Sequence, residues 1–261
     1  MLNGMRTRPV SAASLGGQIL PIALSSARAP AAAATYRSYA FSRPSGRMPE
    51  PVTLADTLER LQAHGARQSF ARNEPIFSQD DPADQVYRIA SGIVRLCRYM
   101  PDGRRYIVDF LLPGDLMGFV ESPDLPVCAE AVTEVSLVSF PRASFDRLAE
   151  QNADVRAHLL RHLSNNLLTV QQHLFVLGCQ KARERVASFL VRLADRMGVT
   201  CGDRLDLPMS RQDIADHLGL TIETVSRTIT GLRGTGAVLI PNAHQIVLRD
   251  MAALRILAAE A

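Results

Sequence analysis

Two short runs of apolar residues at helical spacing follow one another within residues 207–227. Ser210 stands where it can cap the first helix, and Gly219 stands where a helix commonly ends. Thr221 can cap the second helix after a very short turn. The residues that face inward are Ile214, Ala215 and Leu218 in the first helix and Val225 and Ile229 in the second. The pattern predicts a helix-turn-helix.

The outer face of the second helix carries polar side chains that suit base recognition. Glu223, Ser226 and Arg227 stand at i, i+3 and i+4, so they project from one face. Arginine can donate two hydrogen bonds to guanine, and a carboxylate can accept one from the paired cytosine. The same spacing would also suit an ordinary salt bridge between Glu223 and Arg227 on an exposed helix. We favour base reading because these residues lie in a capped pair of helices. The sequence therefore predicts specific binding in the major groove of double-stranded DNA.

Upstream, short alternating segments with Gly and Pro turns between them predict a β sandwich or barrel. The segments are 67–70, 75–78, 85–90, 93–99, 106–112, 127–132 and 135–140. Pro101-Asp102-Gly103 is a strong turn signal, so the strands on either side of it should form a hairpin. Before the first strand, Thr53 caps a predicted helix that ends near Gly65.

A short helix over 143–150 and a long one from Asn152 or Asp154 to about Leu177 follow the strands. The long helix has apolar residues spaced 3, 4, 3, 4 and 3 apart, which is the pattern of a coiled-coil seam. The seam consists of Leu160, Leu163, Leu167, Val170, Leu174 and Leu177. Leu159 and Phe175 lie off it and can pack on the barrel, which leaves the seam for a parallel homodimer. The alternative is that the seam itself packs on the barrel.

The chain after the long helix predicts a winged arrangement. Gly178 is expected to break the long helix, which makes Gly178-Cys179 the hinge between two domains. A helix over 182–197 then leads to the helix-turn-helix. Beyond it, strands over 237–240 and 245–248 predict a hairpin, and Asp250 caps a short closing helix.

Charge and composition restrict the function classes. Residues 1–47 hold six Arg and no acidic residue, and we expect them to be disordered. A transit peptide has a similar composition, and Met48 is an alternative start. Without this tail, 23 basic and 26 acidic residues remain, so DNA affinity must come from a local patch. No run of eighteen apolar residues occurs, so we expect no membrane-spanning helix.

The chain resembles the Crp/Fnr superfamily of bacterial transcription regulators, in particular its FixK/FnrN branch. That branch carries E-x-x-S-R in its second helix, as residues 223–227 do, and residues 91–118 look like the superfamily's jelly-roll sensor domain. The resemblance implies a homodimer that works with RNA polymerase and reads a palindrome such as TTGAT-N4-ATCAA. It also implies control of low-oxygen respiration, denitrification or nitrogen fixation. The phosphate contacts that it implies are Ser210, Arg211, Gln212, Thr221 and Thr224.

The expected fold class is α+β, with an N-terminal β jelly roll of the cyclic-nucleotide-binding kind and a C-terminal winged helix-turn-helix. The expected domains are a disordered tail over 1–47, a sensor-like jelly roll over 53–142, a dimerisation helix region over 143–178 and a DNA-binding domain over 179–261.

The sensor-like domain lacks the residues that would hold two of the superfamily's ligands. No cation lies between Arg105 and Arg142 to hold a cyclic-nucleotide phosphate, and no Cys precedes Cys97 to help hold an iron-sulfur cluster. We therefore expect no cofactor of either kind. Haem is not excluded, because some relatives bind it and histidines lie on the long helix at 158, 162 and 173. A haem-based gas sensor and a cyclic-nucleotide-binding regulatory subunit are the alternative functions, and no catalytic constellation predicts an enzyme.

The four cysteines are Cys97, Cys128, Cys179 and Cys201. They are widely scattered and show neither metal-site spacing nor a disulfide framework, which suits a cytoplasmic protein. Cys179 is the candidate redox thiol, because oxidation would add bulk and polarity at the expected hinge. The alternative is that Cys179 is a small buried hydrophobic residue.

Overall fold

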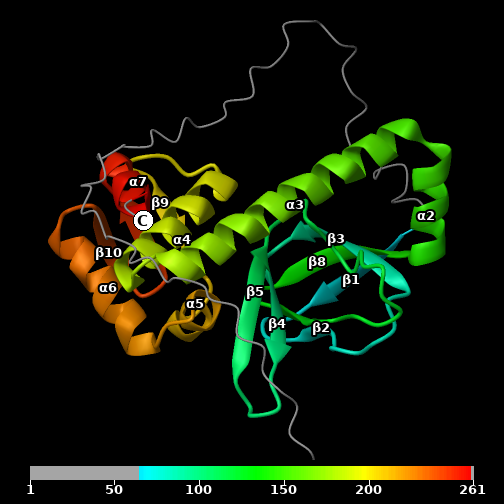
Figure 1. Cartoon of the computed structure of the whole chain (residues 1–261), viewed down its shortest axis with the longest axis horizontal. Coiled ribbons are helices and arrows are strands. Elements are labelled where there is room, and N and C mark those ends of the chain that lie inside the picture. Colours follow the sequence, from blue (N-terminus) through cyan, green and yellow to red (C-terminus); the bar gives the residue numbers. More distant parts are fainter. Residues whose placement is uncertain (1–64, 260–261) are drawn as a thin grey trace, which may run out of the picture. The chain divides into compact units, whose positions relative to one another are not determined.

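The computed structural model describes residues 65–259 of the 261-residue chain (Figure 1). The tail over 1–47 and the helix expected after Thr53 lie outside these residues. The described part contains a β-rich domain, two helices that follow it, and a C-terminal domain of helices with a small sheet. The predicted α+β fold class is confirmed.

Two four-stranded sheets make up the β-rich domain. The first contains, in spatial order, β1 (Ala66–Phe70), β8 (Val135–Pro141), β3 (Gln85–Ser91) and β6 (Leu116–Met117). The second contains β2 (Pro75–Phe77), β7 (Cys128–Ala131), β4 (Val94–Tyr99) and β5 (Arg105–Leu111). All pairings are antiparallel, and the pairs β3–β8 and β4–β7 join strands that are distant in the chain. This connection pattern is the one expected of a jelly roll.

Side-chain alternation along β4 shows how the second sheet uses its two faces. Val94 and Leu96 pack into the cluster between the sheets, together with Leu137 of β8. Arg95 lies between them in sequence and therefore projects from the opposite face, where its guanidinium contacts Glu130 of β7. The outer face of the second sheet is thus free to contact other parts of the chain.

Two helices follow the sheets, α2 (Arg142–Gln151) and α3 (Ala153–Cys179). Asn152 caps α3 by accepting hydrogen bonds from the backbone of Asp154 and Val155 at 3.0 and 3.3 Å. Val155 and Leu159 are buried against the first sheet and Phe145 of α2. Leu159 therefore packs on the barrel, as predicted.

The expected helix break at Gly178 is wrong, because α3 continues through Gly178 to Cys179. A glycine inside a helix costs only about 1 kcal/mol. Arg185 offsets this cost by donating hydrogen bonds to the carbonyls of Leu177 and Gln180, both at 2.9 Å. Gln180 is the extended cap, so helical geometry ends just after Cys179.

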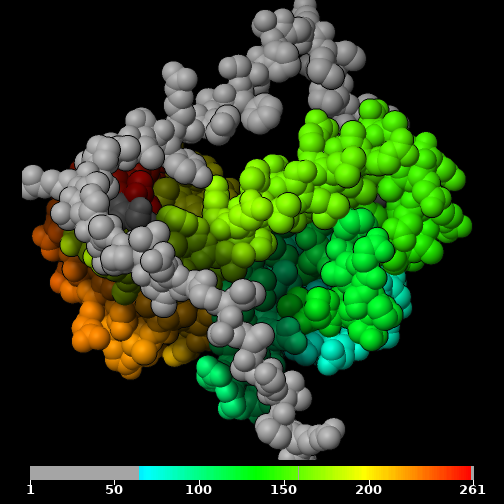
Figure 2. All heavy atoms as spheres, in the orientation of Figure 1, coloured from blue at the N-terminus to red at the C-terminus, as the bar shows by residue number. Residues whose placement is uncertain are grey.

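The seam of α3 is open to solvent in the described chain. Leu160, Leu163, Leu167, Val170 and Leu174 are between 43% and 63% exposed, and Leu177 is half-buried. The space-filling view shows the middle of α3 at the surface (Figure 2). Phe175, which was expected to pack on the barrel, is 50% exposed, so that prediction is wrong. The exposed apolar surface of α3 is therefore wider than the seam, and it also includes Leu168.

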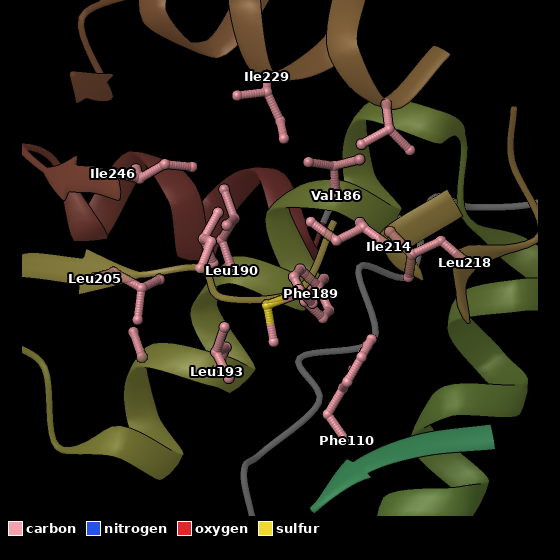
Figure 3. Packing of buried hydrophobic residues seen from close by; sticks show 14 of the residues in the cluster. Phe110, Val186, Phe189, Leu190, Leu193, Leu205, Ile214, Leu218, Ile229 and Ile246 are labelled. Atoms are coloured by element: carbon pink, nitrogen blue, oxygen red, sulfur yellow. The ribbon is translucent and has the colours of Figure 1, made fainter. Parts of the chain in front are cut away.

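The C-terminal domain packs its helices and a three-stranded sheet around one cluster of buried side chains (Figure 3). Its elements are α4 (Ala182–Met197), β9 (Arg204–Asp206), α5 (Arg211–Leu218), α6 (Ile222–Gly234), β10 (Val238–Asn242), β11 (Gln245–Leu248) and α7 (Met251–Ala259). The sheet order is β10-β11-β9. The winged hairpin is confirmed, and β9 adds a strand that the sequence pattern did not predict.

Candidate nucleic-acid interface

Local hydrogen bonds fix both helices of the helix-turn-helix. The Ser210 hydroxyl accepts from the Asp213 backbone, and the Asp213 carboxylate accepts from the Ser210 backbone, both at 3.0 Å. These reciprocal bonds form a capping box at the start of α5. Gly219 ends the helix with φ of 60°, in the left-handed region, and Thr221 caps α6 by accepting from the Thr224 backbone at 3.2 Å. The predicted caps and the predicted stop are confirmed.

Burial of the inner faces sets which side of α6 points outward. Ile214, Ala215, Leu218, Val225 and Ile229 are each no more than 2% exposed. Figure 3 shows Ile214, Leu218 and Ile229 in one cluster with Phe189 and Leu190 of α4. A rotation of α6 about its axis would expose these side chains, so packing holds its outer face in place.

The outer face of α6 presents the three predicted base-reading residues together. Glu223, Ser226 and Arg227 are all exposed. Backbone N–H donation at Glu223 and the Thr221 hydroxyl lower the pKa of the Glu223 carboxyl, and the charge of Arg227 adds less. Glu223 is therefore favoured as a charged hydrogen-bond acceptor, and Arg227 is exposed on the same face.

The predicted phosphate contacts lie at the first turns of α5 and α6. Helix N-termini attract phosphates because their backbone N–H groups are free and the helix dipole is positive there. Arg211 is half-buried, and its Nη1 has no hydrogen-bond partner among the described residues. Burial lowers the pKa of its guanidinium. Gln212 and Thr224 are engaged locally, with Asp216 at 2.6 Å and the Thr221 hydroxyl at 3.0 Å.

Two carboxylates on α5 are neutralised by arginines of the second sheet, which the sequence analysis did not predict. Arg105 contacts Asp213 at 2.5 Å and Asp216 at 2.7 Å, and Arg95 lies 3.5 Å from Asp213. Burial raises the pKa of Asp213, but the Ser210 hydrogen bonds and the two guanidinium groups together lower it below its usual value. Both carboxylates would otherwise repel DNA phosphates near the start of α5.

A histidine pair lies beside these carboxylates. His217 of α5 stacks on His173 of α3, with ring centroids 4.3 Å apart. Its Nδ1 lies 3.0 Å from the Ile107 carbonyl and its Nε2 lies 2.5 Å from the Arg192 guanidinium. His173 also contacts the Tyr106 hydroxyl at 3.3 Å. Packing thus engages His173 with side chains of α5 and β5.

The cysteines do not all remain apart in the fold. Cys97 and Cys128 are buried neighbours, with their Sγ atoms 3.3 Å apart, so the expectation of scattered thiols is wrong for this pair. Both lie on predicted strands, but only strand pairing could reveal that they are opposite each other. Cys179 is exposed at the last residue of α3, which rules out its alternative interpretation as a buried hydrophobic residue in the described chain.

The arginine that follows the β6–β7 segment of the jelly roll is held by neighbouring groups. A cation is needed to hold the cyclic phosphate, and the nearest arginine after the β6–β7 segment is Arg142. Its guanidinium donates to the Val120 carbonyl at 2.5 Å and to Asp146 at 3.0 Å. These groups already occupy Arg142 in the described structure.

Among residues 65–259, no helix combines the length and the apolar content that crossing a membrane requires.

Comparison with known proteins identifies the two domains. Residues 67–152 match the family model of the cyclic nucleotide-binding domain, and residues 184–257 match that of the Crp-like helix-turn-helix domain. The chain is 42% identical to the nitrogen fixation regulation protein FixK of Azorhizobium caulinodans, over 84% of this chain and 92% of that protein. It is 39% identical to the transcriptional activatory protein AadR of Rhodopseudomonas palustris, over 74% of this chain and 80% of that protein.

A solved structure agrees with these relatives. The structure of FixK2 from Bradyrhizobium japonicum superposes with a TM-score of 0.71 at 37% identity, over 76% of this chain and 98% of that one. One family therefore accounts for both domains and for their order in the chain. The chain belongs to the Crp/Fnr family of transcription regulators, in its FixK-like branch, and its C-terminal domain is a DNA-binding helix-turn-helix.

Proposed function

We propose that this protein is a homodimeric transcription activator that reads a palindrome resembling TTGAT-N4-ATCAA. The observation that carries the proposal is the outward face of α6, where Glu223, Ser226 and Arg227 stand together and exposed. We assign Arg227 to the guanine of each half-site, Glu223 to the paired cytosine and Ser226 to a neighbouring thymine. These pairings use the hydrogen-bonding groups that the bases present in the major groove.

The dimer is proposed to form through the seam of α3. Large apolar side chains exposed in a continuous stripe commonly mark a protein interface. Leu168 and Phe175 flank the seam and widen the stripe, so the interface would extend beyond a narrow coiled coil. A parallel dimer would present two copies of α6 to successive major grooves, about 34 Å apart.

The electrostatic basis of DNA binding is proposed to be local. The sequence without its tail carries more acidic than basic residues, so net charge does not favour DNA. Near the start of α5, Arg105 and Arg95 neutralise Asp213, and Arg211 is half-buried with a buried Nη1 that has no hydrogen-bond partner among the described residues. We assign Arg211 to a DNA phosphate, together with Ser210, Gln212, Thr221 and Thr224, which lie at the same two helix N-termini.

The biological role is proposed from the relatives. A curated relative is named for the regulation of nitrogen fixation, and another is named as a transcriptional activator. We infer that this protein acts in the cytoplasm with RNA polymerase on genes for low-oxygen respiration, denitrification or nitrogen fixation. We also infer that it does so without a cyclic nucleotide or an iron-sulfur cluster.

Selection of binding sites from random duplex DNA tests the proposal. The full-length protein is incubated with a randomised library at fixed salt, and bound duplexes are amplified and sequenced over several rounds. We expect an enriched palindrome with a guanine at the same position of both half-sites. Enrichment of a single unpaired half-site would contradict the dimer, and absence of any enriched sequence would contradict specific recognition.

A further inference from the structure

Two buried thiols face each other across neighbouring strands of the jelly roll. Cys97 of β4 and Cys128 of β7 are directly opposite in the strand register. Their Sγ atoms are 3.3 Å apart, and the Cys128 thiol donates to the Cys97 carbonyl at 3.0 Å. Directly opposite residues in antiparallel strands have Cα atoms about 4.5–5.5 Å apart, within the range that a disulfide spans. The backbone therefore already holds the two residues at bonding range.

The surroundings favour a neutral sulfur pair over a metal ion. Among the described residues, the two cysteines and the Glu130 carboxylate form a group that could hold a metal ion. The Glu130 carboxylate is already bound by Arg95 at 2.6 and 2.8 Å and by the Tyr99 hydroxyl at 2.9 Å. A metal ion there would lie beside a guanidinium and would compete with it for the same oxygens. A disulfide carries no charge and leaves these contacts intact.

We propose that Cys97 and Cys128 are a redox-active dithiol that closes to an intramolecular disulfide when the protein meets peroxide. In the first step, the Cys128 sulfur attacks one peroxide oxygen, the O–O bond breaks, and a sulfenic acid and water form. In the second step, the Cys97 sulfur attacks the sulfenic sulfur, the S–O bond breaks, and its thiol proton leaves with the hydroxyl group as water. The two thiols lose two electrons in total, and one peroxide yields two waters.

The burial of each thiol assigns the order of the two steps. Cys128 is 6% exposed and Cys97 is fully buried, so peroxide meets Cys128 first. Burial and the neighbouring Cys128 thiol raise the pKa of Cys97, which makes it a poor first nucleophile. Both thiols belong to the cluster that also contains Phe189 of α4 and Ile214 of α5. Oxidation therefore requires this cluster to open, and it should be slower than oxidation of the exposed Cys179 and Cys201.

Peptide mapping tests the proposal in the full-length protein. The substitutions Cys179→Ser and Cys201→Ser remove the exposed thiols. This protein is treated with hydrogen peroxide in its folded state, then unfolded in N-ethylmaleimide and digested with trypsin. Cleavage after arginine places the two remaining cysteines in separate peptides, 96–98 and 106–142. The proposal predicts a linked pair of these peptides, lighter than their sum by two hydrogen atoms and released by a reductant.

The Cys97→Ser substitution gives the matched control. With Cys97→Ser added, no partner can trap the sulfenic acid, so Cys128 should proceed to sulfinic acid and no linked peptide should form. If the peroxide-treated protein yields no linked peptides and both cysteines are found alkylated, the proposal is overturned. A zinc ion that co-purifies with the untreated protein and shields both thiols from alkylation would also overturn it, in favour of a metal site.

Discussion

At the scale of single residues, His217 has an environment that fixes its protonation state. Arginine can only donate hydrogen bonds, so Nε2 of His217 must accept from Arg192. Nδ1 then carries the hydrogen that is donated to the Ile107 carbonyl. Burial and the charge of Arg192 hold the pKa of His217 well below its usual value. The ring is therefore neutral. The charge of Arg192 also acts on His173, which stacks on this ring.

The histidine pair predicts loss of stability in acid. Burial and Arg192 lower the pKa of His173 from 6.5 to about 4. The unfolded chain binds this proton at higher pH than the folded one, so stability is complete above pH 6.5 and falls as the pH drops toward 4. His173→Gln should reduce the stability difference between neutral pH and about pH 5 by roughly 1 kcal/mol. Urea unfolding at both pH values measures this, and an unchanged difference would show that His173 titrates normally.

The exposed thiol at the end of α3 supports a second prediction at this scale. Sulfenic or sulfinic acid at Cys179 would add a polar group next to the extended residue Gln180, where the helix ends. We expect Cys179→Ala to bind operator DNA like the parent and to lose most of its rapid sensitivity to peroxide. Cys201→Ala, which alters another exposed thiol, is the control. Equal inhibition of the Cys179→Ala protein and the parent would exclude Cys179 as the sensitive thiol.

At the scale of elements, α3 has two faces with different tasks. Val155 and Leu159 bury one face on the first sheet. Leu160, Leu167 and Leu174 leave the other face more than half exposed. A lone surface helix normally turns polar residues toward water, so this face is incomplete without a partner.

Leu167→Asp should therefore separate the proposed dimer. Two carboxylates would face each other in an apolar seam, and neither would find a partner there. Sedimentation velocity should show a monomer, and specific DNA binding should fall with it. Asn165→Asp adds the same charge at an exposed position off the seam and should leave the dimer intact. A dimeric Leu167→Asp protein at micromolar concentration would mean that α3 is not the interface.

The elements themselves were largely predictable because their signals are local. Ser210, Thr221 and Asn152 cap helices through residues two or three positions away, and alternation marks the longer strands. The missed strands β6 and β9 have two and three residues, too few for a period to emerge. Phe175 was placed wrongly because spacing gives its side of the helix but not which neighbour covers that side.

At the scale of the whole molecule, ion pairs join the second sheet to α5. Arg105 and Asp216 are 111 positions apart in the chain, and their side chains are 18% and 13% exposed. No sequence period reports such a pair, and the Cys97–Cys128 contact was missed for the same reason. The exposed polar face of α6 could be predicted because one helix carries all of it, whereas the arginines that neutralise α5 come from another domain.

Arg105→Ala should test how much this contact contributes to stability. It leaves the largely buried carboxylates of Asp216 and Asp213 with fewer partners, so we expect a loss of about 2 kcal/mol in the free energy of unfolding. Arg104 is the matched control, because its ion pair with Asp102 has side chains 79% and 52% exposed. Arg104→Ala should change stability by less than about 0.5 kcal/mol. Equal effects of the two variants in urea unfolding would show that the contact is not stabilising.

The central claim is that Arg227 on α6 reads the guanine of each half-site. A gel-shift series across the four bases at that position, at fixed salt, compares the parent with Arg227→Ala and Arg211→Ala. Losing a bidentate base contact should remove about 1–3 kcal/mol of discrimination per half-site, so Arg227→Ala should prefer guanine much less than the parent does, with Glu223 still able to accept from the paired cytosine. Arg211→Ala should keep the preference, bind every sequence more weakly and depend less on salt. A guanine preference as strong in Arg227→Ala as in the parent would contradict the placing of the recognition helix.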